Sequence, residues 1–368
     1  MSRLIAPLSA IEGQPAAVAT LQALARREGP VPPLLLHGPD GVGKRSAALA
    51  FAGALVCRGP DGTDACGRCA GCARVADAPA VTELREGASG ADAPRTYPDV
   101  GLIGIPSGKT RLSVLQARDI ALSMSVRPFE LSRRIYIVDP ADALTVGAAN
   151  ALLKVLEEPP PFGVLVLVTA SPAALPVTVR SRLTAVRFRP LPADVIERLL
   201  LARGTAAEEA AARAARARGS VARALALDPE AEAARIEAWT RVLGLLAERG
   251  PAGAAGAAVL AGESLAGSAD EAGAALDLLL ALLGEIVAAR EGAAPSLLAP
   301  DAAARLAPAA GRLLGPALDR ALLVEQLRRE IVLINRNPRL AVEGAVLALA
   351  GLLPRGPLVD MVVGTRDR

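Results

Sequence analysis

The segment Leu34-Leu35-Leu36-His37-Gly38-Pro39-Asp40-Gly41-Val42-Gly43-Lys44 decides the fold of this chain. Three consecutive leucines predict a short buried strand, and the Ala-rich run from Lys44 to Val56 predicts a helix. A strand before and a helix after a glycine-rich turn are the context of a phosphate-binding loop, in which backbone N–H groups surround the phosphate and the lysine reaches its terminal oxygens. The residues expected to form this loop are Gly38, Gly41, Gly43 and Lys44.

Two positions that ATP hydrolysis requires differ from the usual pattern. The residue after Lys44 is Arg45, where a Ser or Thr hydroxyl normally binds Mg²⁺, and Ser46 lies one helical step further on, turned by about 100° around the axis. A predicted strand ends in Asp139, whose carboxylate could bind Mg²⁺, but the following Pro140 has no group to polarise an attacking water. We therefore expect a nucleotide fold without hydrolysis, and the same changes place ATP binding in doubt.

The first half of the chain alternates strand and helix patterns. Short apolar, partly β-branched runs predict strands at 34–36, 100–104, 135–138, 164–168 and 185–188. Helical patterns cover 14–27 and 44–56, and helical spacing recurs at Ala149, Leu152, Leu153 and Leu156. This alternation predicts a parallel α/β sheet. Asp142 is expected to cap the turn that follows the third strand.

The longest uncharged stretch, 159–179, contains five prolines that would break a spanning helix, so it predicts loop, strand and loop rather than a membrane segment. Residues 1–10 lack the charged and apolar segments of a secretory signal. We therefore expect a cytoplasmic protein.

After Pro192 the sequence is dominated by Ala, Leu, Arg and Glu, which predicts helices to the end. One apolar stripe consists of Ile236, Trp239, Val242, Leu243 and Leu246, and another of Leu318, Leu322, Leu323, Leu327, Ile331 and Ile334. Such stripes are typical of the buried faces of a helical bundle. Residues 251–267, rich in Gly and Ala, fit either a loose connection or plain helix.

All four cysteines lie in one short segment, as Cys57-x8-Cys66-x2-Cys69-x2-Cys72. Four thiolates separated by small residues can form a closed tetrahedral shell, so the pattern favours a structural zinc site over a catalytic one. Free core thiols or a redox pair are the alternatives, and both are disfavoured because the chain has no other cysteine.

Composition restricts the remaining function classes. The chain has 368 residues, 52% of them hydrophobic and 21% charged, which fits a globular protein of several domains. Its net charge is only +3, so a basic nucleic-acid-binding surface over the whole molecule is not expected. Aromatic residues make up 2% and there is one His, which disfavours stacking platforms for single strands and His-based catalysis.

Taken together, these motifs resemble the bacterial clamp-loader subunits, a family of AAA+ proteins. The most characteristic part is Leu152-Leu153-Lys154-Val155-Leu156-Glu157-Glu158-Pro159-Pro160, which follows the phosphate loop and the cysteine segment along the chain. Val179-Arg180-Ser181-Arg182-Leu183 is similar to the family's Ser-Arg-Cys motif, with Leu183 in place of Cys. Gly219-Ser220-Val221-Ala222-Arg223 resembles the sensor-2 segment, and 335–340 resembles a helix boundary of the collar.

The resemblance implies an architecture and a set of functional residues. It implies an AAA+ module with a zinc insert at 1–189, a helical lid at 190–229, and an all-α collar at 230–368. Arg182 would act in trans as an arginine finger on a neighbouring subunit's ATP. Gly38, Gly41, Gly43, Lys44, Asp139 and Arg223 would form a degenerate nucleotide site.

The resemblance also implies partners and a role. The partners would be the ATP-hydrolysing motor subunits (gamma/tau) and delta in a five-subunit ring, the sliding clamp, and primed DNA through the complex. The chain would be a non-hydrolysing subunit of the DNA polymerase III holoenzyme in chromosomal replication. The alternatives are a hydrolysing motor subunit, which Arg45 and Pro140 disfavour, and a free-standing zinc module that binds nucleic acid.

Overall fold

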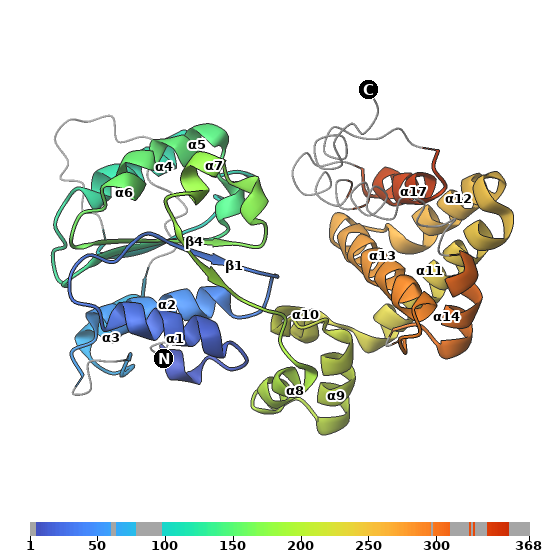
Figure 1. Cartoon of the computed structure of the whole chain (residues 1–368), viewed down its shortest axis with the longest axis horizontal. Helices are drawn as coiled ribbons and strands as arrows, with labels where there is room; N and C mark the ends of the chain where they lie inside the picture. The colour runs from blue at the N-terminus through green and yellow to red at the C-terminus, as the bar shows by residue number, and fades with distance from the viewer. Residues whose placement is uncertain are drawn as a thin grey trace. The chain divides into compact units, whose positions relative to one another are not determined.

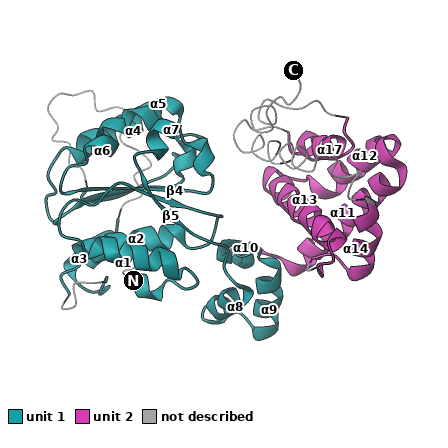
Figure 2. Ribbon diagram, viewed as in Figure 1, with its two compact units in different colours: residues 1–226 teal, residues 227–368 magenta. Residues whose placement is uncertain are grey.

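The computed structural model describes residues 5–59, 64–78, 98–295, 297–309, 324, 327 and 337–352. The chain divides into two compact units, Met1–Ala226 and Leu227–Arg368 (Figure 2). The first unit combines a sheet with helices, whereas the described part of the second unit is helical (Figure 1). The finer three-domain division, with boundaries at 189 and 229, stays a prediction.

A parallel sheet of five strands forms the centre of the first unit, as the sequence predicts. Its strands are β1 (Leu34–His37), β2 (Val100–Ile103), β3 (Arg134–Val138), β4 (Gly163–Thr169) and β5 (Thr184–Arg187). They are arranged in the order β2-β3-β4-β1-β5. Because all strands are parallel, the loops after β1, β3 and β4 lie at one edge of the sheet. This edge brings the phosphate loop to the side of Asp139.

Helices cover both faces of the sheet (Figure 1). One layer contains α1 (Pro15–Ala25), α2 (Lys44–Val56) and α3 (Ala70–Ala76), and the other contains α4 (Val114–Met124), α5 (Val146–Ala151), α6 (Leu153–Glu157) and α7 (Val177–Arg180). Within β1, Leu34 and Leu36 pack into the core under α1 and α2, while Leu35 packs into the core on the opposite face. β1 to β4 are therefore buried on both faces, which explains their largely apolar sequences, whereas the edge strand β5 buries only Val186.

A small helical group follows β5 within the first unit. It consists of α8 (Ala193–Leu201), α9 (Ala207–Arg216) and α10 (Val221–Ala226), which bury a core of their own. Gln14, just before α1, accepts from the Arg189 N–H at 3.0 Å and donates to the Arg189 carbonyl at 2.7 Å. The same amide group donates to the Val42 carbonyl at 3.3 Å. One buried side chain therefore connects the phosphate loop to the segment that leads into these helices.

The second unit is a helical bundle. Its helices include α11 (Pro229–Arg249), α12 (Ala254–Leu265), α13 (Ala269–Arg290), α14 (Pro300–Leu306) and α17 (Pro338–Leu349). The predicted stripe on α11 is buried, and the Trp239 indole donates to the Ala275 carbonyl at 2.8 Å. Residues 251–267 are mostly plain helix. Apart from the buried Leu327, the second predicted stripe lies outside the described residues.

One helix in the described part of the chain, α13, is long and apolar enough to cross a membrane. Leu276, Leu279 and Leu282 on this helix are fully buried in the bundle core. The apolar character of α13 is therefore accounted for by packing within its own unit. Within residues 159–179, β4 follows a loop, as predicted, whereas the predicted second loop also contains the 3-10 turn η3 (Pro172–Ala174) and the start of α7.

Candidate functional site

The predicted phosphate loop lies between β1 and α2, and α2 begins at Lys44, as the sequence indicates. Gly41 and Gly43 have φ angles of 73° and 96°, a region in which a Cβ atom is strained. The positive φ of Gly43 aims the first N–H groups of α2 into the loop. The backbone therefore has the shape that the motif predicts.

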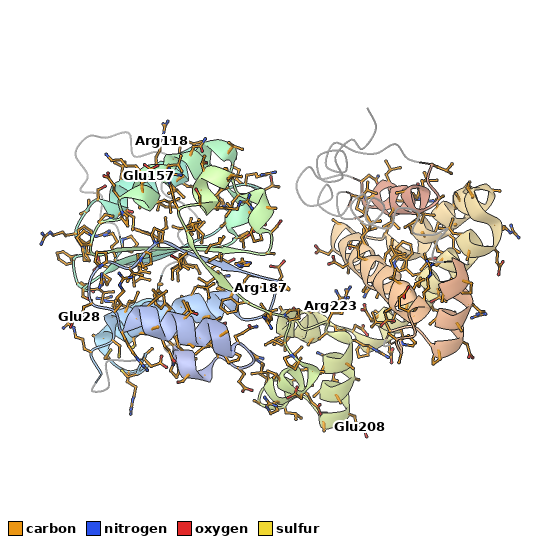
Figure 3. All side chains as sticks on the ribbon, viewed as in Figure 1. Glu28, Arg118, Glu157, Arg187, Glu208 and Arg223 are labelled. Carbon is orange, nitrogen blue, oxygen red and sulfur yellow. The ribbon has the colours of Figure 1, made fainter. Side chains whose placement is uncertain are left out.

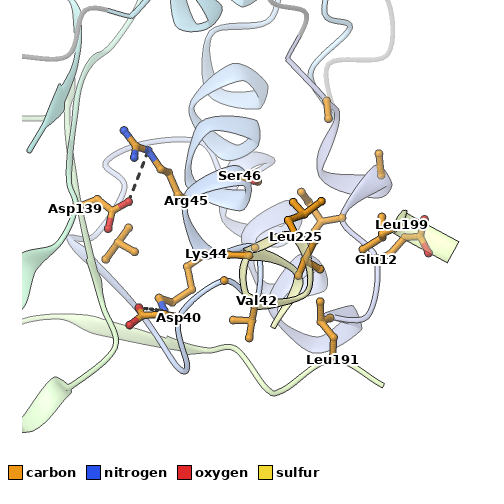
Figure 4. A pocket seen from close by; sticks show the side chains of 18 of the residues that line it. Glu12, Asp40, Val42, Lys44, Arg45, Ser46, Asp139, Leu191, Leu199 and Leu225 are labelled. Atoms are coloured by element: carbon orange, nitrogen blue, oxygen red, sulfur yellow. Dashed lines mark hydrogen bonds and ion pairs between the residues drawn. The ribbon is translucent and has the colours of Figure 1, made fainter. Parts of the chain in front are cut away.

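The Lys44 ammonium group is used by the loop itself. Its side chain is only 6% exposed, and Nζ donates to the carbonyl oxygens of Gly38 at 2.6 Å and Pro39 at 2.5 Å. A third contact reaches the Asp40 carboxylate at 3.4 Å (Figure 4). Since an ammonium has three donors, all are occupied within the loop. A phosphate would have to replace these contacts.

Arg45 faces the carboxylate that would normally bind a metal. Its Nε lies 3.7 Å from Oδ2 of Asp139 (Figure 4). Burial raises the pKa of Asp139, and the positive charges of Arg45 and Lys44 oppose that rise. The half-exposed guanidinium is therefore a counter-ion beside the carboxylate that binds Mg²⁺ in an ATPase of this type.

Asp142, three residues after Asp139, has a different role from the predicted one. It does not cap the following turn, so that prediction is wrong: the turn Ala141–Ala143 has no side-chain cap, and Thr145 caps α5. Asp142 instead accepts a hydrogen bond from the Thr169 hydroxyl at 2.7 Å, because the ends of β3 and β4 are adjacent. The Thr169 hydroxyl, at the end of β4, is thus already bonded within the protein.

Helix α10 contacts the phosphate loop directly. The Val221 N–H donates to the Gly41 carbonyl at 2.9 Å. A Cβ on Gly41 would lie 2.2 Å from Ser220 Oγ and 2.6 Å from Ala222 Cβ, so this approach requires glycine. The start of α10 is therefore hydrogen-bonded directly to the loop.

A cavity of about 520 Å³ lies beside the loop. Predicted residues that line it are Gly41, Gly43, Lys44 and Asp139, together with Arg45. Its apolar wall, which sequence reasoning missed, is formed by Ile11, Leu191, Leu199, Val221 and Leu225. Neither Gly38 nor Arg223 is among the lining residues, although Arg223 lies on α10. The wall has no sequence signal because its members come from distant segments.

The four cysteines converge on one point. Their Sγ atoms all lie within 4.8 Å of one another, with 4.0 Å for Cys66 to Cys72 and for Cys57 to Cys69. Sulfur atoms about 2.3 Å from a tetrahedral zinc ion would be about 3.8 Å apart. The cluster could therefore hold a metal ion if the longest separations shortened by up to about 1 Å.

The backbone holds these thiols in different electrostatic environments. The N–H groups of Arg58 and Cys72 lower the pKa of the Cys69 thiol to about 6. Burial raises the pKa of the Cys72 thiol to about 12. Since thiolates are the metal-binding form, a bound cation would supply the charge needed to deprotonate the buried thiol.

Asp64 connects the cysteine segment to the N-terminal turn η1 (Leu8–Ala10). Its carboxylate accepts from the N–H groups of Leu8 at 2.6 Å and Ser9 at 2.9 Å, and from its neighbour Ala65 at 2.8 Å. Although burial opposes the change, these hydrogen bonds lower the pKa of Asp64. Sequence reasoning missed this residue, whose pattern of partners becomes visible only in the fold.

Arg182 lies away from the cavity, directly after α7 and Ser181. Its guanidinium forms an ion pair with Glu157 at 2.6 Å and donates to the Thr178 carbonyl at 2.7 Å. The side chain is 37% exposed. The structure therefore does not bring Arg182 into this chain's own nucleotide-type site.

The strand order, the phosphate loop after β1, the carboxylate after β3 and the helical group on the loop define a P-loop module of the AAA+ class. Comparisons with known proteins agree with this class. Residues 13–192 match the family described as DNA polymerase III, delta subunit. This match and the similarity to delta-prime subunits support a clamp-loader subunit of the delta-prime type, in agreement with the resemblance seen in the motifs.

Individual relatives agree with this assignment. The chain is 35% identical over 149 residues to the DNA polymerase III subunit delta prime of Pseudomonas aeruginosa, covering 40% of each chain. It is 31% identical over 170 residues to the delta prime subunit of Bacillus subtilis, covering 45% of each. The chain thus spans less than half the length of these curated relatives. A gamma-subunit-related protein of Thermotoga maritima has a TM-score of 0.36 at 17% identity, covering 91% of this chain and 99% of that one.

Proposed function

We propose that this chain is a non-hydrolysing subunit of a DNA polymerase III clamp loader. In this role it would help to open a ring-shaped sliding clamp and place it on primed DNA, while other subunits hydrolyse ATP. The observation that carries the proposal is the ion pair between Arg45 and Asp139, because it places a protein cation where hydrolysis requires a metal. Pro140 removes the base as well.

The proposed assembly is a ring of five subunits that contains gamma/tau motor subunits and delta. Residues 230–368 would be the collar that holds this ring together, 190–229 the lid, and 1–189 the AAA+ module. The bundle that contains α11, α12, α13, α14 and α17 supports a collar because it has its own buried core. The complex would act in the cytoplasm at the nucleoid.

Within the ring, Arg182 would supply positive charge to a neighbouring subunit's ATP. Its exposure and its distance from this chain's own cavity support a role in trans. A guanidinium supplied in this way contributes about 10³ to 10⁵ in rate where it has been measured. The chain would thus donate catalytic charge without consuming ATP.

The proposed ligand of the cysteine cluster is one structural Zn²⁺, held by Cys57, Cys66, Cys69 and Cys72. The four-sulfur shell supports this proposal because it leaves no coordination position for water or substrate. When bound, the ion would hold together the loop between α2 and α3.

The competing motor role is disfavoured by two residues of the site. Arg45 stands where a hydroxyl would bind Mg²⁺, and Pro140 stands where a base would polarise the attacking water.

The deciding experiment isolates native complexes through a tag on this chain. We expect gamma/tau, delta and the sliding clamp to co-purify, and their absence from correctly folded preparations would refute the role. In reconstituted complexes, Arg182→Ala should lower clamp- and DNA-stimulated ATP hydrolysis at the adjacent subunit's site by about 10³-fold or more, the lower end of the range for such arginines. Arg182→Lys, which keeps the charge but not the planar fork, should restore only part of the rate. Equal rates in fully assembled complexes would exclude the trans role.

A further inference from the structure

The edge of the module that carries Arg182 also holds an acidic partner. Oε1 of Glu157 lies 2.6 Å from Nη2 of Arg182. On the other side, Nη1 donates to the Thr178 carbonyl at 2.7 Å and lies 3.4 Å from Ser181 Oγ. The two side chains of the pair are 37% and 48% exposed. The chain thus fixes both terminal nitrogens of a guanidinium that is still accessible.

The place of Glu157 in the fold is unfavourable for its own helix. It is the last residue of α6, in the helical layer that also carries Arg118 (Figure 3). The C-terminal end of a helix carries partial negative charge and disfavours a carboxylate. Its counter-charge comes instead from Arg182, beyond β4 and α7.

Fold stability gives little reason for this pair. Ion pairs between partly exposed side chains contribute only about 0–1 kcal/mol to unfolding free energy. A free arginine, however, has about 2 kcal/mol of rotamer entropy to lose when it is ordered. Contacts that order it in advance remove part of that loss from any later binding step.

The contacts still leave hydrogen-bond donors for an anion. A guanidinium has five N–H donors in one plane. The contacts with Glu157, Thr178 and Ser181 occupy three of them. An approaching phosphate can therefore bind the remaining donors while the carboxylate keeps the group in orientation.

We propose that Glu157 is a positioning residue, which orients Arg182 toward the terminal phosphate of an ATP bound by an adjacent subunit. This inference rests on the proposed trans role of Arg182. It assigns a function to one of two adjacent glutamates, and Glu158 provides a matched control because it has the same charge and is also exposed.

The test measures clamp- and DNA-stimulated ATP hydrolysis by reconstituted complexes that contain Glu157→Gln, Glu157→Asp or Glu158→Gln. We expect Glu157→Gln to lower kcat by about tenfold at unchanged KM, since misorientation of a catalytic group costs up to about 10² in rate. Glu157→Asp should fall between wild type and Glu157→Gln, and Glu158→Gln should stay within about twofold of wild type, as for surface changes away from a site. Subunit stoichiometry and thermal unfolding confirm equal assembly and folding.

A double-substitution cycle identifies the residue through which Glu157 acts. In an Arg182→Ala background, Glu157→Gln should cause no further loss, because the group that it orients is gone. A further loss there, an unchanged kcat in Glu157→Gln alone, or an increased kcat would each overturn the positioning role while leaving the trans role of Arg182 standing. An unchanged rate in Arg182→Ala alone would overturn the trans role itself.

Discussion

The cysteine cluster and the Asp139 carboxylate beside the phosphate loop are both suited to bind a cation, but their negative charge is balanced in different ways. At the cluster, four thiols lie within 4.8 Å of one another, and under the proposed function a bound ion would supply the positive charge. At the loop, the Asp139 carboxylate already has Arg45 as its counter-ion. The phosphate loop thus keeps the backbone shape of a nucleotide site, although a side chain takes the place of the metal ion beside it. The cysteine cluster has no such side chain among the contacts described for it, and it keeps the ligands for an ion.

The largest effect is expected when the cluster loses its ligands. We expect wild type purified without chelators to contain about one Zn²⁺ per chain and Cys69→Ala with Cys72→Ala to contain none, since a structural shell needs four ligands. The double substitution should lower the unfolding free energy of the first unit by several kcal/mol, on the order of 3 or more, because metal binding contributes directly to folding. Elemental analysis and urea unfolding measure both quantities. Full metal occupancy in the double variant would contradict the proposed ligand set.

A second substitution tests whether the start of α10 packs against Gly41 of the phosphate loop. Gly41→Ala should lower the unfolding free energy by about 2–4 kcal/mol, because strain at positive φ adds to a collision with Ser220 and Ala222. Gly43→Ala is the matched control. Gly43 also has a positive φ, but an added Cβ would lie in open space, so the unfolding free energy should fall by only about 1–2 kcal/mol. Urea unfolding of the two variants makes the comparison. Equal losses would mean that the contact with α10 is not maintained in solution.

The ion pair at Asp139 should have a smaller effect that depends on pH. Burial raises the pKa of Asp139 in the folded state above its ordinary value of 3.8. The protonated carboxyl therefore stabilises the fold below pH 3.8, and this contribution to the unfolding free energy is lost as pH rises through the folded-state pKa. At pH 7, the unfolding free energy of Asp139→Asn should therefore equal that of wild type or exceed it by up to about 1 kcal/mol, and this difference in stability should shrink in acid.

A control cycle isolates the role of Arg45 in this pair. Arg45→Met should cost more stability in wild type than in Asp139→Asn, because only the carboxylate needs a counter-ion. Chemical unfolding between about pH 4 and pH 7 follows both differences. Greater stability of wild type over Asp139→Asn at neutral pH would contradict the expected sign.

The smallest effect is expected from Mg²⁺ and ATP on the isolated chain. Hydrolysis should not exceed background, because Arg45 provides no metal ligand and Pro140 no base. A coupled phosphate-release assay measures this directly. Turnover that Lys44→Ala abolishes would show that the loop still works as an ATPase.

Much of the fold could be predicted from local sequence. Buried parallel strands read as continuous apolar runs, and the five predicted runs all overlap observed strands. The cysteine cluster was equally accessible, because its ligands lie close together along the chain and its geometry follows from short turns.

The electrostatic state of the phosphate loop could not be predicted in the same way. The absence of a hydroxyl at Arg45 was evident, but its pairing with Asp139 depends on the adjacency of β1, β4 and β3. Asp142 shows the same limit: capping is a local rule, and a nearby Thr169 on another strand overrode it. The contact of Val221 with Gly41 likewise joins segments far apart in the chain.

Asp64 connects the cysteine segment to one wall of the cavity beside the phosphate loop. Its carboxylate anchors the turn at Leu8 and Ser9, and the same N-terminal segment continues into Ala10 and Ile11, which line the cavity. If the cysteine segment binds a metal, we therefore expect the ion to order one wall of the cavity as well. Because such coupling is reciprocal, a small molecule that favours the ordered wall would tighten metal binding by the same factor by which the metal tightens binding of the small molecule.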